Sequence, residues 1–389
     1  MKVLLSSIGT RGDMEPFLAV GQMLMARGHE VVCTMPEQFG PLVEETGLRF
    51  RSLGPEFMDM LDSDDGRKAM GGGGESILGK FLPMLRLARR GPIVNRKMIE
   101  RQRVIFEEEK PERVVCNGKS TYPFIWEIEG RHLDIQRPKP TVLLPIPYMH
   151  YVKGHAHLVF NRNLGSFLNI LTFRLTNFGL VKSVMISIKS LHLKNKIKRP
   201  EVKESILNGD SIYTISPTLF PRPNYWPENL QVLGHYERSI QSEWSPTKAL
   251  EDFLSTSEKI VFITFGSMTN PAPEAITKLL MDVCVKKGIK AIFNIAAGGL
   301  VEPKKYDRSQ FHFIDRVPYA WIFPKIYAVV HHGGSGTTHT ALKYGCASMI
   351  IPHIIDQFAW NDIVARQGVG PKGPSMGKIQ NNLKSYSQI

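Results

Sequence analysis

The chain has 389 residues, of which 42% are hydrophobic and 22% are charged. This balance is typical of globular proteins and excludes a disordered chain, collagen and a coiled coil, while the length predicts about two to three domains. No uninterrupted apolar run of about eighteen residues occurs, so no membrane-spanning helix is predicted. The apolar run after Met1 is too short for a signal peptide and indicates a first strand. We therefore expect a cytoplasmic protein.

The net charge indicates which partners the protein could bind, and the cysteine spacing indicates whether disulfides or a metal site are expected. Lys and Arg outnumber Asp and Glu by 49 to 36, and the net charge of +13 favours anionic partners: nucleic acid, phosphorylated metabolites or an anionic membrane. Cys33, Cys116, Cys284 and Cys346 are widely spaced and form no C-x-x-C pair. We expect neither disulfides nor a cysteine-based metal site.

Strand and helix patterns alternate along both halves of the chain. In the first half we expect strands at 2–7, 30–34, 48–52, 113–117 and 141–146, with a helix after Pro16 and another from 37 to about 46. In the second half we expect strands at 259–265, 289–296, 311–314, 326–331 and 348–352, with helices near 273–287, 340–344 and 358–366. Such alternation predicts an α/β protein with parallel sheets.

A stretch rich in Pro, Gly and polar residues separates the two series. We interpret residues 1–235 and 258–389 as two domains and 236–257 as the linker between them. Two α/β domains joined in this way form a cleft, where ligands are expected to bind. Residues 59–75, which include four consecutive glycines, are expected to form a flexible loop.

The segment from 135 to 200 is unusual because it contains no Asp or Glu but has eleven Lys and Arg residues among many apolar ones. A basic and apolar stretch can lie on an anionic membrane surface. The alternative is a helix with a solvated basic face. Nucleic-acid binding is not expected, since no recognition motif accompanies the charge.

The strongest local signal is HHGGSGTT at 331–338, which follows a predicted strand and opens a helix. Glycines let backbone N–H groups approach an anion, and the helix start favours negative charge. With His332, Thr337 and Thr338 as further donors, the pattern predicts a diphosphate site. The alternative is a glycine-rich turn without a ligand.

Acidic residues near predicted strand ends are the other candidates. Asp356 and Gln357 suit the hydroxyls of a sugar, or alternatively cap the following helix. The loop from Gly9 to Asp13 lacks the G-x-G-x-x-G spacing, which excludes a Rossmann dinucleotide site. Asp13 is a candidate general base, with a helix cap or a salt bridge to Arg11 as the alternative. The acidic residues at 62, 64 and 65 are interpreted as solvated and not as metal ligands.

Four motifs then stand in order along the chain: GTRGDMEP, FITFGSM, VPYAWIFPKIYAVVHHGGSGTT and IIPHIIDQFAWND. Together they resemble the UDP-glycosyltransferases of the GT-B fold, in the branch of the sterol glucosyltransferases and the bacterial antibiotic and lipid glycosyltransferases. The resemblance runs from residue 1 to about 375 and is weakest across 55–240, which in this family is the acceptor half. It implies two Rossmann-like parallel-sheet domains that face a central cleft.

The resemblance also implies roles for individual residues. Asp13 matches the general base of members with GTRGD. The plant members have a stacking Trp at the position of Arg316. The matches to donor-binding positions are Ser267 at the diphosphate, the backbone of Arg316 and Val317 at the uracil, His332, Gly334, Gly336 and Thr337 in the diphosphate loop, and Asp356 and Gln357 at the sugar hydroxyls.

What the resemblance implies for function is an inverting transfer of a hexose from a UDP-sugar to a hydroxyl of a hydrophobic acceptor such as a sterol, lipid or polyketide. The helix start, backbone amides and His332 would stabilise the leaving UDP, so no metal ion or cofactor is expected. Family members usually continue with helices beyond this point, so we expect a C-terminal domain shortened at Ile389. The alternatives are a UDP-sugar epimerase and a degenerate sugar-nucleotide-binding protein without transfer activity.

Overall fold

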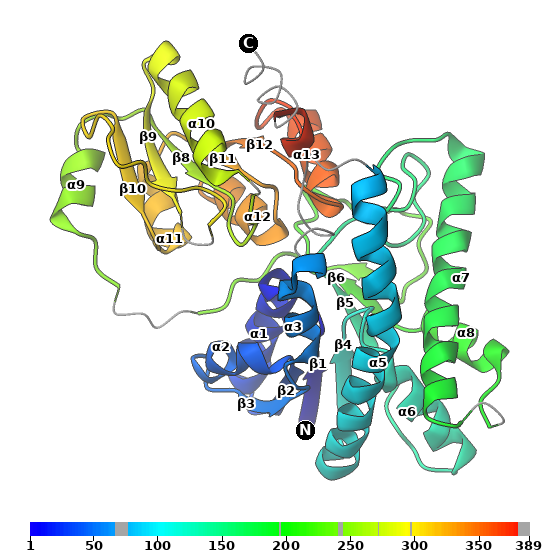
Figure 1. Cartoon of the computed structure of the whole chain (residues 1–389). Helices are drawn as coiled ribbons and strands as arrows, with labels where there is room; N and C mark the ends of the chain where they lie inside the picture. Colours follow the sequence, from blue (N-terminus) through cyan, green and yellow to red (C-terminus); the bar gives the residue numbers. More distant parts are fainter. Residues whose placement is uncertain (67–76, 194–195, 240–243, 271, 296–297, 380–389) are drawn as a thin grey trace. The chain divides into compact units, whose positions relative to one another are not determined.

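The computed structural model describes residues 1–66, 77–193, 196–239, 244–270, 272–295 and 298–379, apart from the side chains of 77–85 and of residue 88. The chain divides near residue 241 into two compact units (Figure 1). Each unit is built around its own parallel sheet, with seven strands in the first and five in the second. The predicted α/β class with two parallel-sheet domains is therefore confirmed.

The first sheet has the strand order β3-β2-β1-β4-β5-β6-β7, and every described pairing in it is parallel. Its strands are β1 (Lys2–Ser6), β2 (Glu30–Met35), β3 (Arg49–Ser52), β4 (Arg113–Cys116), β5 (Thr141–Leu144), β6 (Ser211–Tyr213) and β7 (Leu230–Val232). The five strands predicted for this half are confirmed to within two residues at each end. Both β6 and β7, which are only three residues long, were not predicted.

Helices cover both faces of this sheet. Neighbouring residues of β1 point to opposite faces, so they pack against different helices. Leu5 packs with Phe17 of α1, whereas Leu4 packs with Phe106 of α5 and Tyr122 of α6. The helices of the first unit are α1 (Arg11–Met25), η1 (Glu37–Phe39), α2 (Gly40–Glu44), α3 (Glu56–Asp62), α5 (Ile77–Glu109), α6 (Tyr122–His132), α7 (Ser166–Ser190) and α8 (Arg199–Leu207).

The flexible loop predicted at 59–75 is wrong in its first part. α3 covers residues 56–62, since Phe57 and Met58 both pack against the core of the unit. Residues 67–76, which hold the four glycines, lie outside the described residues.

The second sheet has the order β10-β9-β8-β11-β12 and is parallel in every described pairing. Its strands are β8 (Ile260–Thr264), β9 (Lys290–Asn294), β10 (Phe311–Ile314), β11 (Ala328–His331) and β12 (Ala347–Ile350). Its helices are α9 (Lys248–Leu254), α10 (Pro273–Lys287), α11 (Tyr319–Ile322), η2 (Phe323–Lys325), α12 (Ser335–Lys343) and α13 (Asp356–Arg366). All five predicted strands are confirmed to within two residues at each end.

Most of the described part of the stretch predicted as a linker, 236–257, packs onto one unit or the other. Arg238, with a side chain only 5% exposed, forms ion pairs with Glu15 and Glu45 of the first unit. α9 buries Leu250 and Phe253 in the core of the second unit. The helix is short, and only its Thr247 cap, which accepts a hydrogen bond from the Leu250 amide, marks its start.

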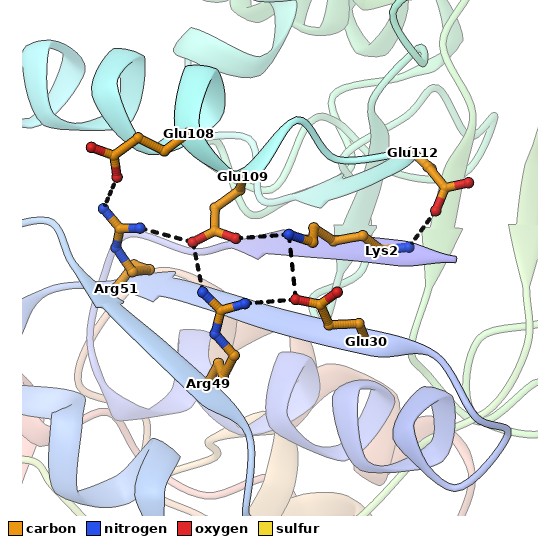
Figure 2. A network of polar contacts seen from close by, with 7 residues as sticks. All are labelled: Lys2, Glu30, Arg49, Arg51, Glu108, Glu109 and Glu112. Atoms are coloured by element: carbon orange, nitrogen blue, oxygen red, sulfur yellow. Dashed lines mark hydrogen bonds and ion pairs between the residues drawn. The ribbon is translucent and has the colours of Figure 1, made fainter.

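A network of charges closes the amino-terminal edge of the first sheet (Figure 2). Glu109, at the end of α5, is 4% exposed and receives Lys2 Nζ at 3.2 Å, Arg49 Nη2 at 2.9 Å and Arg51 Nη1 at 2.8 Å. Burial alone would raise the pKa of Glu109, but the hydrogen bonds from Lys2 and Arg51 outweigh it and the pKa is lowered. The network ties the end of α5 to β1 and β3. On its rim, Glu108 pairs with Arg51.

The four cysteines are buried free thiols, in agreement with the prediction of no disulfide. Among the helices that the structure describes, none is long and apolar enough to cross a membrane.

Candidate functional site

The residues predicted to bind a sugar-nucleotide donor lie at one edge of the second sheet. Because its strands are parallel, their carboxyl ends meet at the same edge, and this edge is where open α/β sheets bind ligands. The segments that follow β8, β10, β11 and β12, as far as the first turns of α12 and α13, together carry Ser267, Arg316, Val317, His332, Gly334, Gly336, Thr337, Asp356 and Gln357.

The His332 ring lies between two glycines from different segments. A Cβ atom on Gly266, in the turn after β8, would lie 2.7 Å from His332 Cε1. A Cβ atom on Gly334 would lie 2.5 Å from His332 Nε2. Gly266 also has a φ of +55°, in the left-handed region that favours glycine. The imidazole therefore occupies a slot that only glycine on both sides leaves open.

α12 begins at Ser335, five residues earlier than predicted, with Gly334 as its N-cap. Its first turn therefore contains Gly336, which is exposed, and Thr337, which is buried. The amide groups of a first helical turn have no partner within the helix, and the helix dipole adds partial positive charge. The end of α12 next to His332 is thus suited to an anion.

Three buried histidines gather at this strand edge. His331 Nδ1 accepts a hydrogen bond from the Gly333 amide at 3.1 Å, and His353 Nδ1 donates one to the Ile351 carbonyl at 2.9 Å. Within the described part of the chain, Nε2 of His331, Nδ1 of His332 and Nε2 of His353 are buried and have no hydrogen-bond partner. Such orphaned atoms indicate a site that a ligand or water completes.

These histidines are neutral at neutral pH. Burial lowers the pKa of His331 to about 3 and that of His353 to about 4. The pKa of His332 lies well below its ordinary value. Burial is the main cause, and the neighbouring His331 and His353 lower the pKa further. A neutral imidazole donates one hydrogen bond and accepts another, so the His332 ring is a hydrogen-bonding group and not a fixed cation.

The pair Asp356–Gln357 forms the first turn of α13, which starts two residues earlier than predicted. Gln357 Oε1 accepts hydrogen bonds from the amides of His353 at 2.7 Å and Ile354 at 3.1 Å. Its carbonyl oxygen therefore fixes the loop after β12. Asp356 is half-buried beside it.

An aromatic residue that the sequence did not predict also lies at this edge. Trp244 Nε1 donates a hydrogen bond to the Arg316 carbonyl at 3.3 Å, and its ring lies 4.9 Å from that of Trp321. Trp244 belongs to the stretch predicted as a linker, and no local pattern marked it. The structure thus places an indole next to the backbone that the resemblance assigns to the nucleotide base, while the Arg316 side chain is exposed.

Asp13 lies at the carboxyl edge of the first sheet, in the first turn of α1 and not in a loop. α1 begins at Arg11 because Thr10 and Asp13 form a capping box, in which Asp13 Oδ2 accepts from the Thr10 amide at 2.8 Å. Asp13 Oδ1 receives Lys119 Nζ at 2.9 Å. The sequence offered a salt bridge between Asp13 and Arg11 as an alternative, but Arg11 pairs with Glu15. Lys119 was missed because 106 residues separate it from Asp13.

Close packing holds this pair in place. Gly9 has a φ of +149°, and a Cβ atom there would lie 2.1 Å from Asp13 Oδ2 and 2.8 Å from Lys119 Nζ. Ser7 Oγ donates to the Asp13 carbonyl at 2.9 Å and in turn accepts from Asn117 Nδ2 at 3.1 Å. The loops after the adjacent strands β1 and β4 therefore fix one carboxylate and one ammonium group, and the Asp13 side chain remains 24% exposed.

The acidic residues at 62, 64 and 65 show no arrangement for a metal. Asp62 and Asp64 are exposed, and Asp65 pairs with Arg86 at 3.3 Å. Among the described residues, no group of three or more His, Cys, Asp or Glu side chains could hold a metal ion.

Comparisons with known proteins identify related domains and a shared fold. Residues 3–115 match the glycosyltransferase family 28 N-terminal domain, and residues 309–387 match the erythromycin biosynthesis protein CIII-like, C-terminal domain. The crystal structure of the Streptomyces sp. SF2575 glycosyltransferase SsfS6, complexed with thymidine diphosphate, superimposes with a TM-score of 0.59 at 18% identity, over 95% of this chain and 87% of that one. The chain has the GT-B fold.

Two curated relatives of this GT-B protein fall in the branch that the motifs indicated. Sterol 3-beta-glucosyltransferase UGT80A2 of Arabidopsis thaliana is 26% identical over 95% of this chain and 57% of its own length. O-mycaminosyltylonolide 6-deoxyallosyltransferase of Streptomyces fradiae is 27% identical over 100% of this chain and 89% of its own. The resemblance to sterol and antibiotic glycosyltransferases is thereby confirmed. This chain spans little more than half of the first of these relatives.

Proposed function

We propose that this protein transfers a hexose from a nucleoside diphosphate sugar to a hydroxyl group of a hydrophobic acceptor, with inversion at the anomeric carbon. The observation that carries the proposal is the His332 ring, held between Gly266 and Gly334 at the start of α12 with Nδ1 unpaired among the described residues. An imidazole and free helix amides at one point are suited to a diphosphate. Names of relatives such as sterol 3-beta-glucosyltransferase support the same class.

The proposed donor site extends from the diphosphate to both ends of the donor. The sugar hydroxyls are assigned to Asp356 and Gln357, and the diphosphate to Ser267 and the first turn of α12. The nucleotide base of the donor is assigned to the backbone of Arg316 and Val317, beside the Trp244 indole. Both uracil and thymine fit such a backbone-and-indole environment, and the SsfS6 structure contains thymidine diphosphate. The donor is therefore a UDP-sugar or a TDP-sugar.

The proposed chemistry is a single displacement. Asp13 takes the proton of the acceptor hydroxyl while its oxygen bonds to the anomeric carbon and the bond to the diphosphate breaks. A positioned general base contributes about 10²–10⁴-fold to such a step. The α12 amides and His332 take up the charge that develops on the leaving nucleotide, so we assign no metal ion and no other cofactor to the step.

A second candidate is a sugar-nucleotide-binding protein without transfer activity. It is favoured by the state of Asp13, whose two carboxylate oxygens are engaged by the Thr10 amide and Lys119 Nζ. In this reading Asp13 is a helix cap and an ion-pair partner only. The two candidates share the donor site and differ in what Asp13 does.

The first experiment is calorimetric titration of the full chain with UDP and with TDP, in the presence of EDTA. The donor site predicts binding without metal, and His332→Ala is expected to weaken it about tenfold or more, because a hydrogen bond to a charged group is lost. His312→Ala is the matched control, since His312 lies on β10 in the same unit but outside these loops. Undetectable binding of both nucleotides would contradict the donor site.

The second experiment tests transfer. UDP-glucose and TDP-glucose are incubated with a sterol and with a macrolide aglycone, products are detected by mass spectrometry, and the anomeric configuration is read by NMR. A β-glycoside from the α-linked donor supports inversion. Nucleotide binding without any product from either acceptor class favours the second candidate.

A further inference from the structure

α7 differs from an ordinary surface helix because its exposed side carries many large apolar residues. Its buried side includes polar Asn169, Thr172 and Ser187 beside Val184 and Ile188. Its exposed side carries large apolar residues, which are Phe167, Leu168, Leu171, Leu175, Phe178 and Ile186. A surface helix normally places charged and polar residues on its outer side. The outer side of α7 therefore calls for an explanation that packing within the first unit does not supply.

The exposed apolar residues form one continuous stripe. Phe167, Leu171, Leu175 and Phe178 are spaced by four, four and three positions, so they lie along one face of the helix. Their exposed fractions are 78%, 52%, 58% and 49%. Figure 1 shows α7 beside α8, and contacts with α6 and α8 cover its inner side. Large contiguous apolar patches of this kind mark interaction sites.

Basic groups accompany the stripe. Arg174, Lys182 and Lys189 are exposed on the same face of α7, by the same helical spacing. The Arg199 guanidinium lies 4.6 Å from the ring centroid of Phe178. In the loop before α7, Arg162 is exposed close in sequence to Val159, which is 66% exposed.

Acidic groups are absent from this stretch and few beside it. Residues 135–200 contain no Asp or Glu. On the neighbouring α8, the Glu201 carboxylate pairs with His132, and Glu204 is exposed. The face is therefore both apolar and strongly cationic.

We propose that the outer face of α7 docks on the surface of an anionic lipid bilayer. Phe and Leu side chains enter the boundary between headgroups and acyl chains, while Lys and Arg contact the lipid phosphates. A second copy of this chain is a poorer occupant, because a two-fold interface would bring the basic Arg174, Lys182 and Lys189 of both copies into one interface. The inference does not depend on the transfer reaction proposed above.

The test is sedimentation of the full chain with vesicles of phosphatidylcholine alone or with about 30% phosphatidylglycerol, since binding through basic residues requires anionic lipid. Binding is expected to the anionic vesicles only. A variant with Leu171→Gln, Leu175→Gln and Phe178→Gln is expected to lose at least about tenfold in affinity. A variant with Arg174→Gln, Lys182→Gln and Lys189→Gln is expected to bind about a hundredfold more weakly and to lose most of its salt dependence.

The matched control carries Val283→Gln and Val285→Gln on α10, where the two side chains are 50% and 57% exposed. Its binding is expected to equal that of the unchanged protein. Equal binding by the apolar triple variant, equal binding to neutral vesicles, or no vesicle binding at all would overturn the proposal. So would a dimer, measured by analytical ultracentrifugation, that the apolar triple variant abolishes.

A labelling experiment avoids reliance on loss of binding. Phe167→Cys is coupled to an environment-sensitive fluorophore, which reacts selectively because the four natural cysteines are buried. Anionic vesicles are expected to shift its emission to shorter wavelength, whereas the same label at Val283→Cys stays unchanged. Equal responses at the two positions would contradict docking through α7.

Discussion

Lys119 Nζ lies 2.9 Å from Asp13 Oδ1, and the two residues follow adjacent strands of the first sheet. The ammonium group and the Thr10 amide hold the carboxylate in one orientation while leaving part of it accessible. A fixed, accessible carboxylate can remove a proton, whereas a purely structural cap has no need of exposure. The variants at this pair therefore separate a base from a cap.

Asp13→Asn is expected to reduce transfer about 10²–10⁴-fold while leaving nucleotide binding unchanged. The amide oxygen of Asn can still accept from the Thr10 amide, so α1 keeps its capping interaction. Asp13→Ala is the comparison, because it removes both functions and is expected to cost about 1 kcal/mol of stability as well. Initial transfer rates, calorimetry and thermal unfolding measure the three effects. Transfer by Asp13→Asn at the original rate would remove Asp13 from the mechanism.

Gly9→Ala is expected to abolish transfer without changing the Asp13 side chain itself. The new Cβ would lie 2.1 Å from Asp13 Oδ2, so the carboxylate has to leave its position. Gly12→Ala is the control in the same segment, since its Cβ meets nothing closer than 4.0 Å and alanine favours a helix. The transfer rates of the two variants are compared after calorimetry has shown that both bind the nucleotide with equal affinity. If both retain activity, the placement of the carboxylate does not matter.

Glu109→Gln is expected to destabilise the first unit by about 3 kcal/mol or more, because it removes the buried carboxylate that Lys2, Arg49 and Arg51 share. Glu108→Gln is the neighbouring control. Its side chain is 54% exposed, and an exposed ion pair contributes about 1 kcal/mol or less. Urea unfolding gives both values. Equal losses for the two variants would show that burial of Glu109 is energetically unimportant.

Acid is expected to weaken the second unit well above the pH at which carboxylates titrate. The pKa of His353 falls from 6.5 to about 4 through burial, so the unfolded chain binds a proton that the folded chain does not. The stability from this difference is present above pH 6.5 and is lost as the pH falls toward 4. The loss from this group is about 2 kcal/mol at about pH 5.

The measurement compares thermal unfolding at neutral pH and at about pH 5. His353→Phe is expected to remove the contribution of His353, so that its stability falls less than that of the unchanged protein. His192→Gln, at an exposed histidine of the first unit, is the control for replacing a histidine. An identical pH dependence for His353→Phe and the unchanged protein would contradict the assignment.

How far the sequence alone predicts this fold depends on the segment. The strands of the second sheet are apolar runs that end at polar or glycine-containing turns, and their positions follow from composition. α5 escapes prediction because Gly91 and Pro92 stand inside it and read as helix breakers. The three-residue strands β6 and β7 are too short for any periodicity. β6 pairs with β5 and β7, and β7 pairs with β6 at the edge of the sheet, so neighbouring strands define both.

The candidate site likewise has residues that the sequence locates and contacts that it does not. Residues near predicted strand ends could be located from sequence, because parallel strands bring those ends together. The contacts of Asp13 with Lys119 and of Arg316 with Trp244 join residues that are 106 and 72 positions apart. Nothing local encodes such contacts. They are fixed only when the sheets form.

The interior place of β1 in the first sheet, between β2 and β4, has a consequence for the order of folding. β1 pairs with β2 on one side, but its other partner is β4, where Ser6 lies opposite Cys116. During synthesis one edge of β1 therefore stays open until α5 and β4 have left the ribosome, and an open apolar strand is prone to wrong pairing. Substitutions in α5 should then reduce the yield of soluble protein more than they reduce the stability of the finished fold.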